Sequence, residues 1–184
     1  HGTREWAWQA EIESYGRDFR ADSGFVPQVD YRQASANVFR TWWGEPKDWY
    51  SRIQLGTGWD YSEDQDGRLL ENEIEVAGML SGPMQSNVEM LVGHRSRSYG
   101  GVLFDQDYGT VWGEVRPSGA LEIELGVDFG DRLDYANVRN GTVLGVEPEI
   151  EWRAGRHLSL EAAYLHEQLD VDGGRLYTAR LAQL

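Results

Sequence analysis

The sequence contains no cysteine and no long apolar run, and these two absences narrow the classes of protein that it can form. Without cysteine there are no disulfide bonds and no thiol chemistry. No segment approaches the roughly 18 apolar residues of a membrane-spanning helix, so any crossing of a bilayer has to use β-strands. Residues His1–Trp6 are too polar for a secretory signal peptide, and we expect a mature or trimmed N-terminus.

Basic residues are scarce as well. The chain has 17 lysine and arginine residues against 31 aspartate and glutamate residues, which gives a formal net charge of -14. A nucleic-acid-binding face must neutralise phosphates with basic side chains, so nucleic acid is excluded as an expected partner. Lys47 is the only lysine, and arginine forms forked pairs with carboxylates. This composition suits inward-facing Arg–Glu ladders, although a solvated surface would also account for it.

The dominant pattern that is present is a two-residue alternation of apolar and polar side chains. In Arg68–Ser81 the apolar row is Leu70, Ile74, Val76 and Leu80, and the opposing row is Glu71, Glu73, Glu75 and Ala77. The segments Trp49–Tyr61 and Gly119–Phe129 alternate in the same way. Successive strand residues point to opposite faces, so each segment predicts a strand with one apolar and one wet side.

The same pattern predicts about ten strands in a single domain over residues 1–184, without an internal linker. They are Thr3–Tyr15, Val29–Trp42, Trp49–Tyr61, Arg68–Ser81, Asn87–Ser98, Thr110–Arg116, Ala120–Phe129, Thr142–Arg153, His157–Leu169 and Arg175–Leu184. Sequential hairpins make an antiparallel up-and-down meander the simplest topology. The predicted fold class is all-β, an antiparallel up-and-down transmembrane β-barrel or part of a larger one.

The spacing between the strands favours a barrel in the outer membrane. Short turn signals are expected at Gly44–Asp48, Gly82–Ser86, Pro117–Gly119 and Ala154–Arg156, and longer polar segments at Gly16–Gln28, Ser62–Gly67, Tyr99–Gly109, Gly130–Asn140 and Asp170–Gly174. The two sets alternate, as in barrels with short periplasmic turns and longer external loops. Aromatic residues such as Trp42, Trp59 and Trp152 fall near strand ends, where interfacial girdles lie. Packing of the same rings in a soluble core is the alternative.

Candidate site residues lie on the polar faces of these strands. We predict that a wet lumen is lined by Glu71, Glu73, Glu75, Arg95, Arg97, Glu122 and Glu124, and that these residues contact any bound solute. Carboxylates about 5–10 Å apart can hydrolyse glycosides, but a polar lumen produces the same spacing without catalysis. No convergent nucleophile or base accompanies them, so we do not expect an enzyme.

Metal and cofactor signals are weak. The four histidines, His1, His94, His157 and His166, show no metal-ligand spacing. Acidic segments at Ser62–Gly67 and Asp170–Gly174 resemble calcium loops but lack the remaining ligands, and turn formation explains them more simply. No metal and no cofactor is expected.

Several motifs resemble one bacterial family. They are Asp18–Arg32 (DFRADSGFVPQVDYR), Gly130–Asn140 (GDRLDYANVRN), Pro148, Gly155–Leu158 (GRHL) and Gly173–Leu184 (GGRLYTARLAQL). In order, they are similar to the membrane portion of a family in which a carbohydrate-binding-family-9-like domain precedes a C-terminal outer-membrane β-barrel of unassigned function. The resemblance implies fold and location but no catalytic residues. It also implies closing strands beyond Leu184, so we expect a barrel fragment with an unpaired edge.

Together these observations predict a porin-like outer-membrane β-barrel of a Gram-negative bacterium that acts as a pore, a receptor or a membrane anchor. Its expected partners are the lipid bilayer and a carbohydrate or other small solute, with a link to carbohydrate binding or uptake implied by the resemblance. The alternative is a soluble secreted β-sandwich or lipocalin-like barrel that binds a sugar or small ligand, and a membrane-embedded hydrolase ranks third. The surroundings of Ile53, Leu55 and Trp59 distinguish the membrane barrel from the soluble protein, because this face contacts lipid in the first and a protein core in the second.

Overall fold

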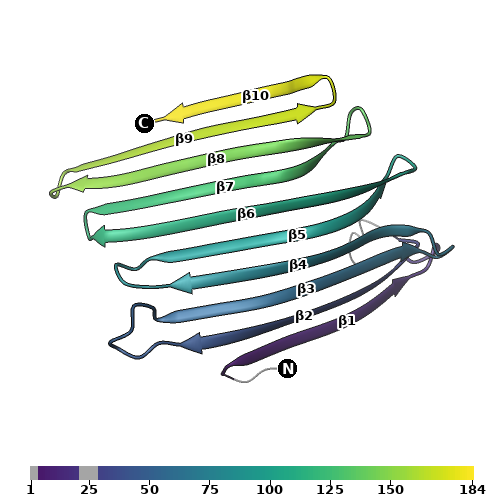
Figure 1. The fold of residues 1–184 in the computed structure, drawn as a ribbon, viewed down its shortest axis with the longest axis horizontal. Coiled ribbons are helices and arrows are strands. Elements are labelled where there is room, and N and C mark those ends of the chain that lie inside the picture. Colours follow the sequence, from purple (N-terminus) through teal and green to yellow (C-terminus); the bar gives the residue numbers. More distant parts are fainter. Residues whose placement is uncertain (1–3, 21–28) are drawn as a thin grey trace.

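The chain forms a single antiparallel sheet, shown in Figure 1 from a computed structural model that describes residues 4–20 and 29–184. Its ten strands are β1 (Trp6–Tyr15), β2 (Tyr31–Trp43), β3 (Arg52–Asp64), β4 (Leu69–Ser81), β5 (Asn87–Tyr99), β6 (Val102–Ser118), β7 (Leu121–Asp134), β8 (Arg139–Ala154), β9 (Leu158–Val171) and β10 (Gly174–Gln183). No helix in these residues is long and apolar enough to span a membrane.

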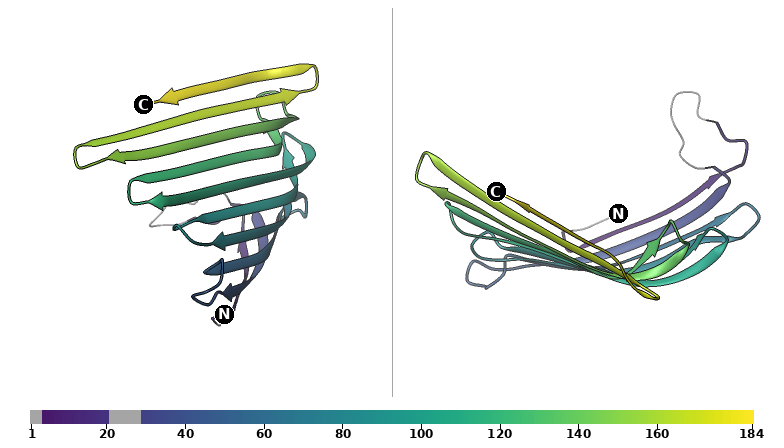
Figure 2. Two further views of the ribbon diagram at one scale, coloured as in Figure 1. Left: turned by 60° about the vertical axis from the view of Figure 1, so that its left-hand side comes forward. Right: turned by 90° about the horizontal axis from the view of Figure 1, so that it is seen from above.

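Each strand pairs with its neighbours in sequence, so the strand order is β1 to β10 without a crossover. All ten predicted strands and the predicted meander are therefore confirmed. In the described residues β1 and β10 each pair with one neighbour, and the sheet is not closed. This agrees with the expected unpaired edge. The sheet curves into a trough, which Figure 2 shows from two further sides.

The predicted lengths of the connections are partly wrong. Tyr99–Gly109 was expected as a loop, but β5 and β6 are joined by Gly100 and Gly101 alone, at φ 60° and 81°. Gly130–Asn140 likewise contains the end of β7 and the start of β8 around a turn at residues 135–138. These strand ends carry polar side chains on both faces and therefore look like loops in the sequence. The expected loop at Gly16–Gln28 includes residues 21–28, which lie outside the described part.

The connection after β2 is longer than predicted. Residues 44–51 form a longer loop, closed where the Gly44 amide donates to the Ser51 carbonyl over 3.0 Å. Asp48 Oδ2 accepts from the Glu45 amide and fixes the turn inside it. Trp49 belongs to this loop and not to β3, which corrects the predicted start of that strand. This local turn chemistry outweighs the alternation that extends back to Trp49.

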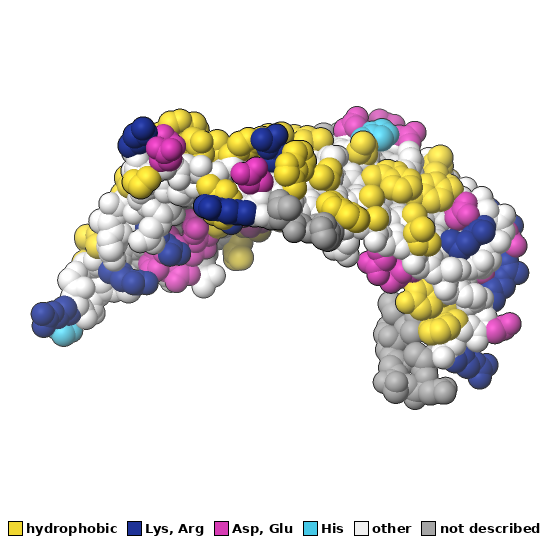
Figure 3. Space-filling view, turned by 90° about the horizontal axis from the view of Figure 1, so that it is seen from below, with side chains coloured by type: hydrophobic (Ala, Val, Ile, Leu, Met, Phe, Trp, Pro, Cys, Tyr) yellow, Lys and Arg dark blue, Asp and Glu magenta, His cyan; other side chains and the backbone are white. Residues whose placement is uncertain are grey.

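The two faces of the sheet differ in chemistry as the alternation predicts. The strand register places Leu55, Val76, Val92, Val111, Val127 and Val146 on the same, convex face with their apolar neighbours. No second layer covers this face in the described residues, and Leu55, Ile74 and Leu125 remain 50%, 53% and 46% exposed. Figure 3 shows hydrophobic side chains along the outer side of the arch and acidic ones on its inner side.

Curvature buries part of the concave face. Gln106 is only 1% exposed and Leu169 only 3%, although no second layer of the described residues lies above them. Aromatic rings of one strand also lie over glycines directly opposite on the next, Phe39 over Gly56 and Tyr108 over Gly93 on the concave face and Phe129 over Gly109 on the convex face. Such ring-on-glycine pairs fill the gap left by the missing side chain and help to fix the register.

Candidate functional site

The concave face brings the predicted carboxylates of β4 against the predicted arginines of β5. The hairpin at residues 82–86 sets the register, so that Glu71 faces Arg97 and Glu73 faces Arg95. Arg97 Nε lies 2.6 Å from Glu71 Oε2, and Arg95 Nη1 lies 3.6 Å from Glu73 Oε1. The structure therefore assembles these four residues into two cross-strand ion pairs. Glu75 lies on the same face, opposite Gly93.

Tyr108 of β6 completes this group and was not predicted. Its hydroxyl oxygen lies 2.5 Å from Glu73 Oε1 and 2.6 Å from Glu75 Oε1. A phenol has one hydrogen, so this single donor bridges two carboxylates. The Arg95 guanidinium lies 5.0 Å from the centre of the Tyr108 ring, within cation–π range. The Tyr108 hydrogen bonds and the Arg95 charge beside Glu73 together offset the repulsion between Glu73 and Glu75.

A chain of hydrogen bonds extends from this group toward β8. Arg95 donates to Gln106 Oε1 over 3.1 Å, and Gln106 Nε2 donates to Asn140 Oδ1 over 3.0 Å. Asn140 Nδ2 in turn donates to the Asp105 carbonyl over 2.9 Å. No buried side-chain nitrogen or oxygen in the described residues lacks a partner. A fully satisfied polar network of this kind holds side chains in one arrangement.

The tip of the β7–β8 hairpin leans toward the β5–β6 turn. Arg97 Nη1 donates to the Tyr135 hydroxyl over 3.4 Å, and the rings of Tyr99 and Tyr135 meet edge to face at 5.0 Å. The hairpin itself is held by Asp134, which accepts from Asn137 Nδ2 over 2.7 Å and from Arg139 Nε over 3.0 Å. The Asn137 amide and the Arg139 guanidinium lower the pKa of Asp134. The β7–β8 hairpin tip therefore partly covers the end of the trough where the β5–β6 turn lies.

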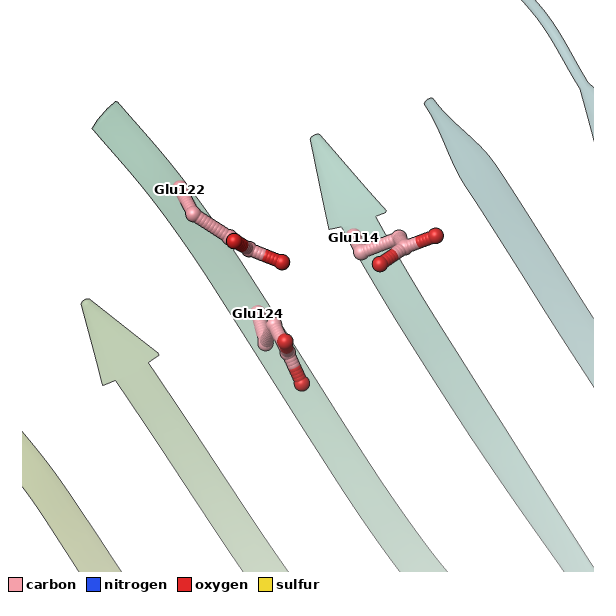
Figure 4. A group of neighbouring side chains, drawn as sticks. All are labelled: Glu114, Glu122 and Glu124. Carbon is pink, nitrogen blue, oxygen red and sulfur yellow. The ribbon is translucent and has the colours of Figure 1, made fainter. Parts of the chain in front are cut away.

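The two remaining predicted residues, Glu122 and Glu124, belong to a separate acidic group near the opposite strand ends (Figure 4). Carboxylate oxygens of Glu114, Glu122 and Glu124 lie within 4.8 Å of one another. Arg116 pairs with Glu122 and lies 3.6 Å from Glu114 Oε2. Three such carboxylates could offer ligands to a cation, but Arg116 already supplies positive charge to two of them.

The acidic group continues onto β8. Glu124 faces Glu114 on one side and Glu149 on the other, so three carboxylates occupy one row across three strands. Directly opposite like charges destabilise a sheet by a fraction of a kcal/mol to about 1 kcal/mol per pair. In the described part of the chain neither Glu147 nor Glu149 has an ion-pair partner. The concave face therefore carries an uncompensated negative charge along β6 to β8.

A shallow cavity of about 360 Å³ lies on the concave face between β2 and β6. Apolar side chains, among them Phe39, Met79, Leu91 and Trp112, form most of its wall. Glu89 and Gln54 are its hydrogen-bonding side chains, together with Thr110. An apolar wall with a few polar groups is typical of small-molecule sites.

The acidic segments and the described histidines that were considered as metal ligands form turns, ion pairs or convex-face contacts in the structure. Within the predicted Ser62–Gly67 segment, residues 62–64 end β3, and Asp64 Oδ1 accepts from the Asp66 and Arg68 amides and so caps the turn at residues 65–68. Asp170 pairs with Arg175 over 2.9 Å. His94 Nδ1 lies 2.8 Å from Asp107 Oδ1 on the convex side. None of the histidines belongs to a metal-ligand group within residues 4–20 and 29–184.

Of the site residues that were not predicted, some could have been identified from the sequence and others could not. Glu147, Glu149 and Glu151 alternate with apolar residues just as Glu71, Glu73 and Glu75 do, so the pattern could have identified them. Tyr108 could not be identified in this way, because its segment looked like a loop. Comparisons with known proteins add nothing here, since no protein-family model, curated protein or solved structure matches this sequence. The resemblance noted from the sequence motifs stays a prediction.

Proposed function

We propose that this chain forms the wall of an outer-membrane β-barrel whose convex face contacts lipid and whose concave face lines a water-filled lumen. One observation carries the proposal: an apolar face without a covering layer alternates with a charged face along consecutive strands. In water, so large an exposed apolar surface is unfavourable. In a bilayer the same surface contacts lipid tails instead of water. Paired β-strands can span a bilayer without a helix.

The dimensions support a membrane position. On β8 the convex apolar row runs from Leu144 to Trp152, which is about 27 Å along the strand at about 3.4 Å per residue. A tilt of about 40° reduces this to about 21 Å, close to the expected apolar height of about 25 Å. Trp42 and Trp152 mark one boundary of the band, and Trp59, stacked on Tyr61, marks the other.

The lumen charge supports a pore that favours cations. Glu71 and Glu73 are balanced by Arg97 and Arg95, whereas Glu147 and Glu149 have no basic ion-pair partner in the described residues. Rings of carboxylates are the usual means of cation selection. A receptor or membrane anchor would use the same wall with a closed lumen. A carbohydrate as the transported or bound solute rests on the family resemblance alone.

A soluble β-sandwich or lipocalin-like barrel would bury the apolar row of Ile53, Leu55 and Trp59 beneath a second layer or inside a closed interior. In the described residues this row lies on the convex side of one sheet, and Leu55 and Trp59 are 50% and 41% exposed. No specific observation favours the soluble alternative. We therefore propose the membrane wall as the function of this chain.

The test uses the natural full-length protein. We expect it to fractionate with the outer membrane and to migrate differently in gel electrophoresis with and without boiling, as folded barrels do. Reconstituted into planar bilayers, it should conduct and favour cations over anions. Recovery in a soluble fraction would overturn the membrane proposal, whereas insertion without conductance would retain the wall and exclude the open pore.

A further inference from the structure

A cation lies between two indole rings at one edge of the convex face. Arg40 of β2 faces Trp6 of β1 in register, and Trp42 follows two residues later on the same face. The Arg40 guanidinium carbon lies 5.2 Å from the centre of the Trp6 ring and 4.9 Å from that of the Trp42 ring. Both distances are within cation–π range, so the guanidinium is held beside the ring faces.

Arg40 differs from the arginines of the concave face. Within residues 4–20 and 29–184 no carboxylate lies within ion-pair distance of Arg40, whereas Arg97 and Arg132 each pair with a glutamate. On the convex face, Arg32 pairs with Glu63 over 2.9 Å. Arg40 therefore presents a charge on the apolar side of the wall that no acidic side chain of the described chain balances.

A second cation–indole contact lies at the same strand ends but on the other face, because Trp43 follows Trp42 by one residue and faces Arg52. Arg4, just before β1, places its guanidinium carbon 5.6 Å from the centre of the Trp43 ring, and its carbonyl accepts from Trp43 Nε1 over 3.2 Å. No ion pair to Arg4 occurs in the described residues either. The Arg4–Trp43 contact therefore belongs to the concave side of these strand ends, whereas Arg40 and its two indoles lie on the convex side.

We propose that the convex-face corner formed by Arg40, Trp6 and Trp42 binds the phosphate of an anionic phospholipid, with Arg40 as the contact. The inference rests on the proposed function, since it requires the convex face to meet lipid. Indole rings favour the headgroup level, and arginine extends its charged end to that level while its stem stays in the apolar layer. The planar guanidinium offers forked donors that match phosphate oxygens. A neutral headgroup leaves the positive charge unbalanced, so phosphatidylglycerol is preferred over phosphatidylcholine.

The test measures which lipid the full-length protein retains. The protein is reconstituted into vesicles of phosphatidylcholine with a minor fraction of phosphatidylglycerol, extracted gently and examined by native mass spectrometry. Arg40→Gln should reduce the retention of phosphatidylglycerol relative to phosphatidylcholine about fivefold, the weight of one basic residue at an anionic surface. Arg40→Lys should keep part of the preference. Arg180→Gln removes a convex-face charge on β10 without neighbouring indoles and should change nothing.

The outcomes separate this site from the barrel proposal. Failure of the wild-type protein to insert into pure phosphatidylcholine vesicles would count against the barrel wall itself. Normal insertion with equal retention of the two lipids, or an Arg40→Gln variant with unchanged preference, would overturn the lipid site alone. If Arg40→Gln does not insert, Arg40→Met, which removes the charge and keeps an apolar stem, provides the second comparison, and its unchanged preference would overturn the proposal.

Discussion

The phenol ring of Tyr108 lies directly over Gly93, the residue opposite it on β5, and a Cβ at Gly93 would come within 2.5 Å of the ring. The small residue and the large ring are therefore one structural unit. The position of the ring in turn aims the hydroxyl at Glu73 and Glu75.

Gly93→Ala should displace the ring and destabilise the fold by about 1–3 kcal/mol, the usual cost of overpacking. Gly126→Ala is the matched control on the same face, because its nearest neighbour, Glu147 Cβ, lies 3.6 Å away. Removing the flexibility of an unstrained glycine there should be neutral or stabilise by about 0.4–1 kcal/mol. Denaturant unfolding in lipid vesicles measures both, and equal effects would argue against the ring-on-glycine unit.

The second prediction concerns the two faces of β7. Leu125→Arg should destabilise the inserted protein by about 2–4 kcal/mol, because its side chain lies near the middle of the apolar band. Glu124→Arg should be mild or stabilising, because Glu124 lies between Glu114 and Glu149 on the concave face. The measurement is the unfolding free energy in vesicles. Equal tolerance at the two positions would contradict the assignment of the lipid face.

The third prediction concerns ion preference. Glu73→Gln and Glu124→Gln should both weaken the preference for cations, measured as the reversal potential under a salt gradient. We expect the larger effect at Glu124, because Arg95 and Tyr108 already balance Glu73 while Glu124 faces two further carboxylates. An equal or larger effect of Glu73→Gln would indicate that the β4–β5 group controls permeation.

The fourth prediction concerns pH at the β7–β8 hairpin, which lies beyond the apolar band. The pKa of Asp134 is lowered in the folded state by Asn137 and Arg139. Its contribution to stability is therefore present above the unfolded-state pKa of about 3.9 and is lost as the pH falls through the folded-state value. Asp134→Asn should increase cleavage by an acid protease near Tyr135 at pH about 4–5 but not at the lowest pH. A difference that is independent of pH would refute this explanation.

The fifth prediction concerns sidedness and uses the absence of cysteine. Strands extend past the apolar band at the end that carries the 135–138 turn, which is the behaviour expected of the external side. Ala136→Cys should react with a membrane-impermeant maleimide on intact cells, and Lys47→Cys should react only after the outer membrane is opened. The reverse pattern would invert the orientation.

The strands were predictable from the sequence because alternation is a direct consequence of strand geometry. The strand ends beyond the apolar band were not, since Asp105 and Asp107 share the convex face with no apolar contrast to reveal the period. The error at Trp49 has a different cause, because a local turn around Asp48 delays the start of β3 to Arg52.

The candidate site could likewise be predicted only in part. The Glu71–Arg97 and Glu73–Arg95 pairs were predictable because both strands flank one short hairpin that sets their register. The contacts of Tyr108, Gln106 and Asn140 reach across more than one strand and depend on the curvature of the sheet. Periodicity contains no information about curvature, so these partners became visible only in three dimensions.

The strictly sequential pairing of β1 to β10 has a consequence for how such a wall assembles. Each ladder joins segments that are adjacent in the chain, so every hairpin can form after the closure of a short loop, at low entropic cost. In the proposed barrel, only the seam between the outermost strands requires distant parts of a chain, or separate chains, to meet. The search for that final contact should therefore set the rate of folding, while the order of all other strands follows from the chain itself.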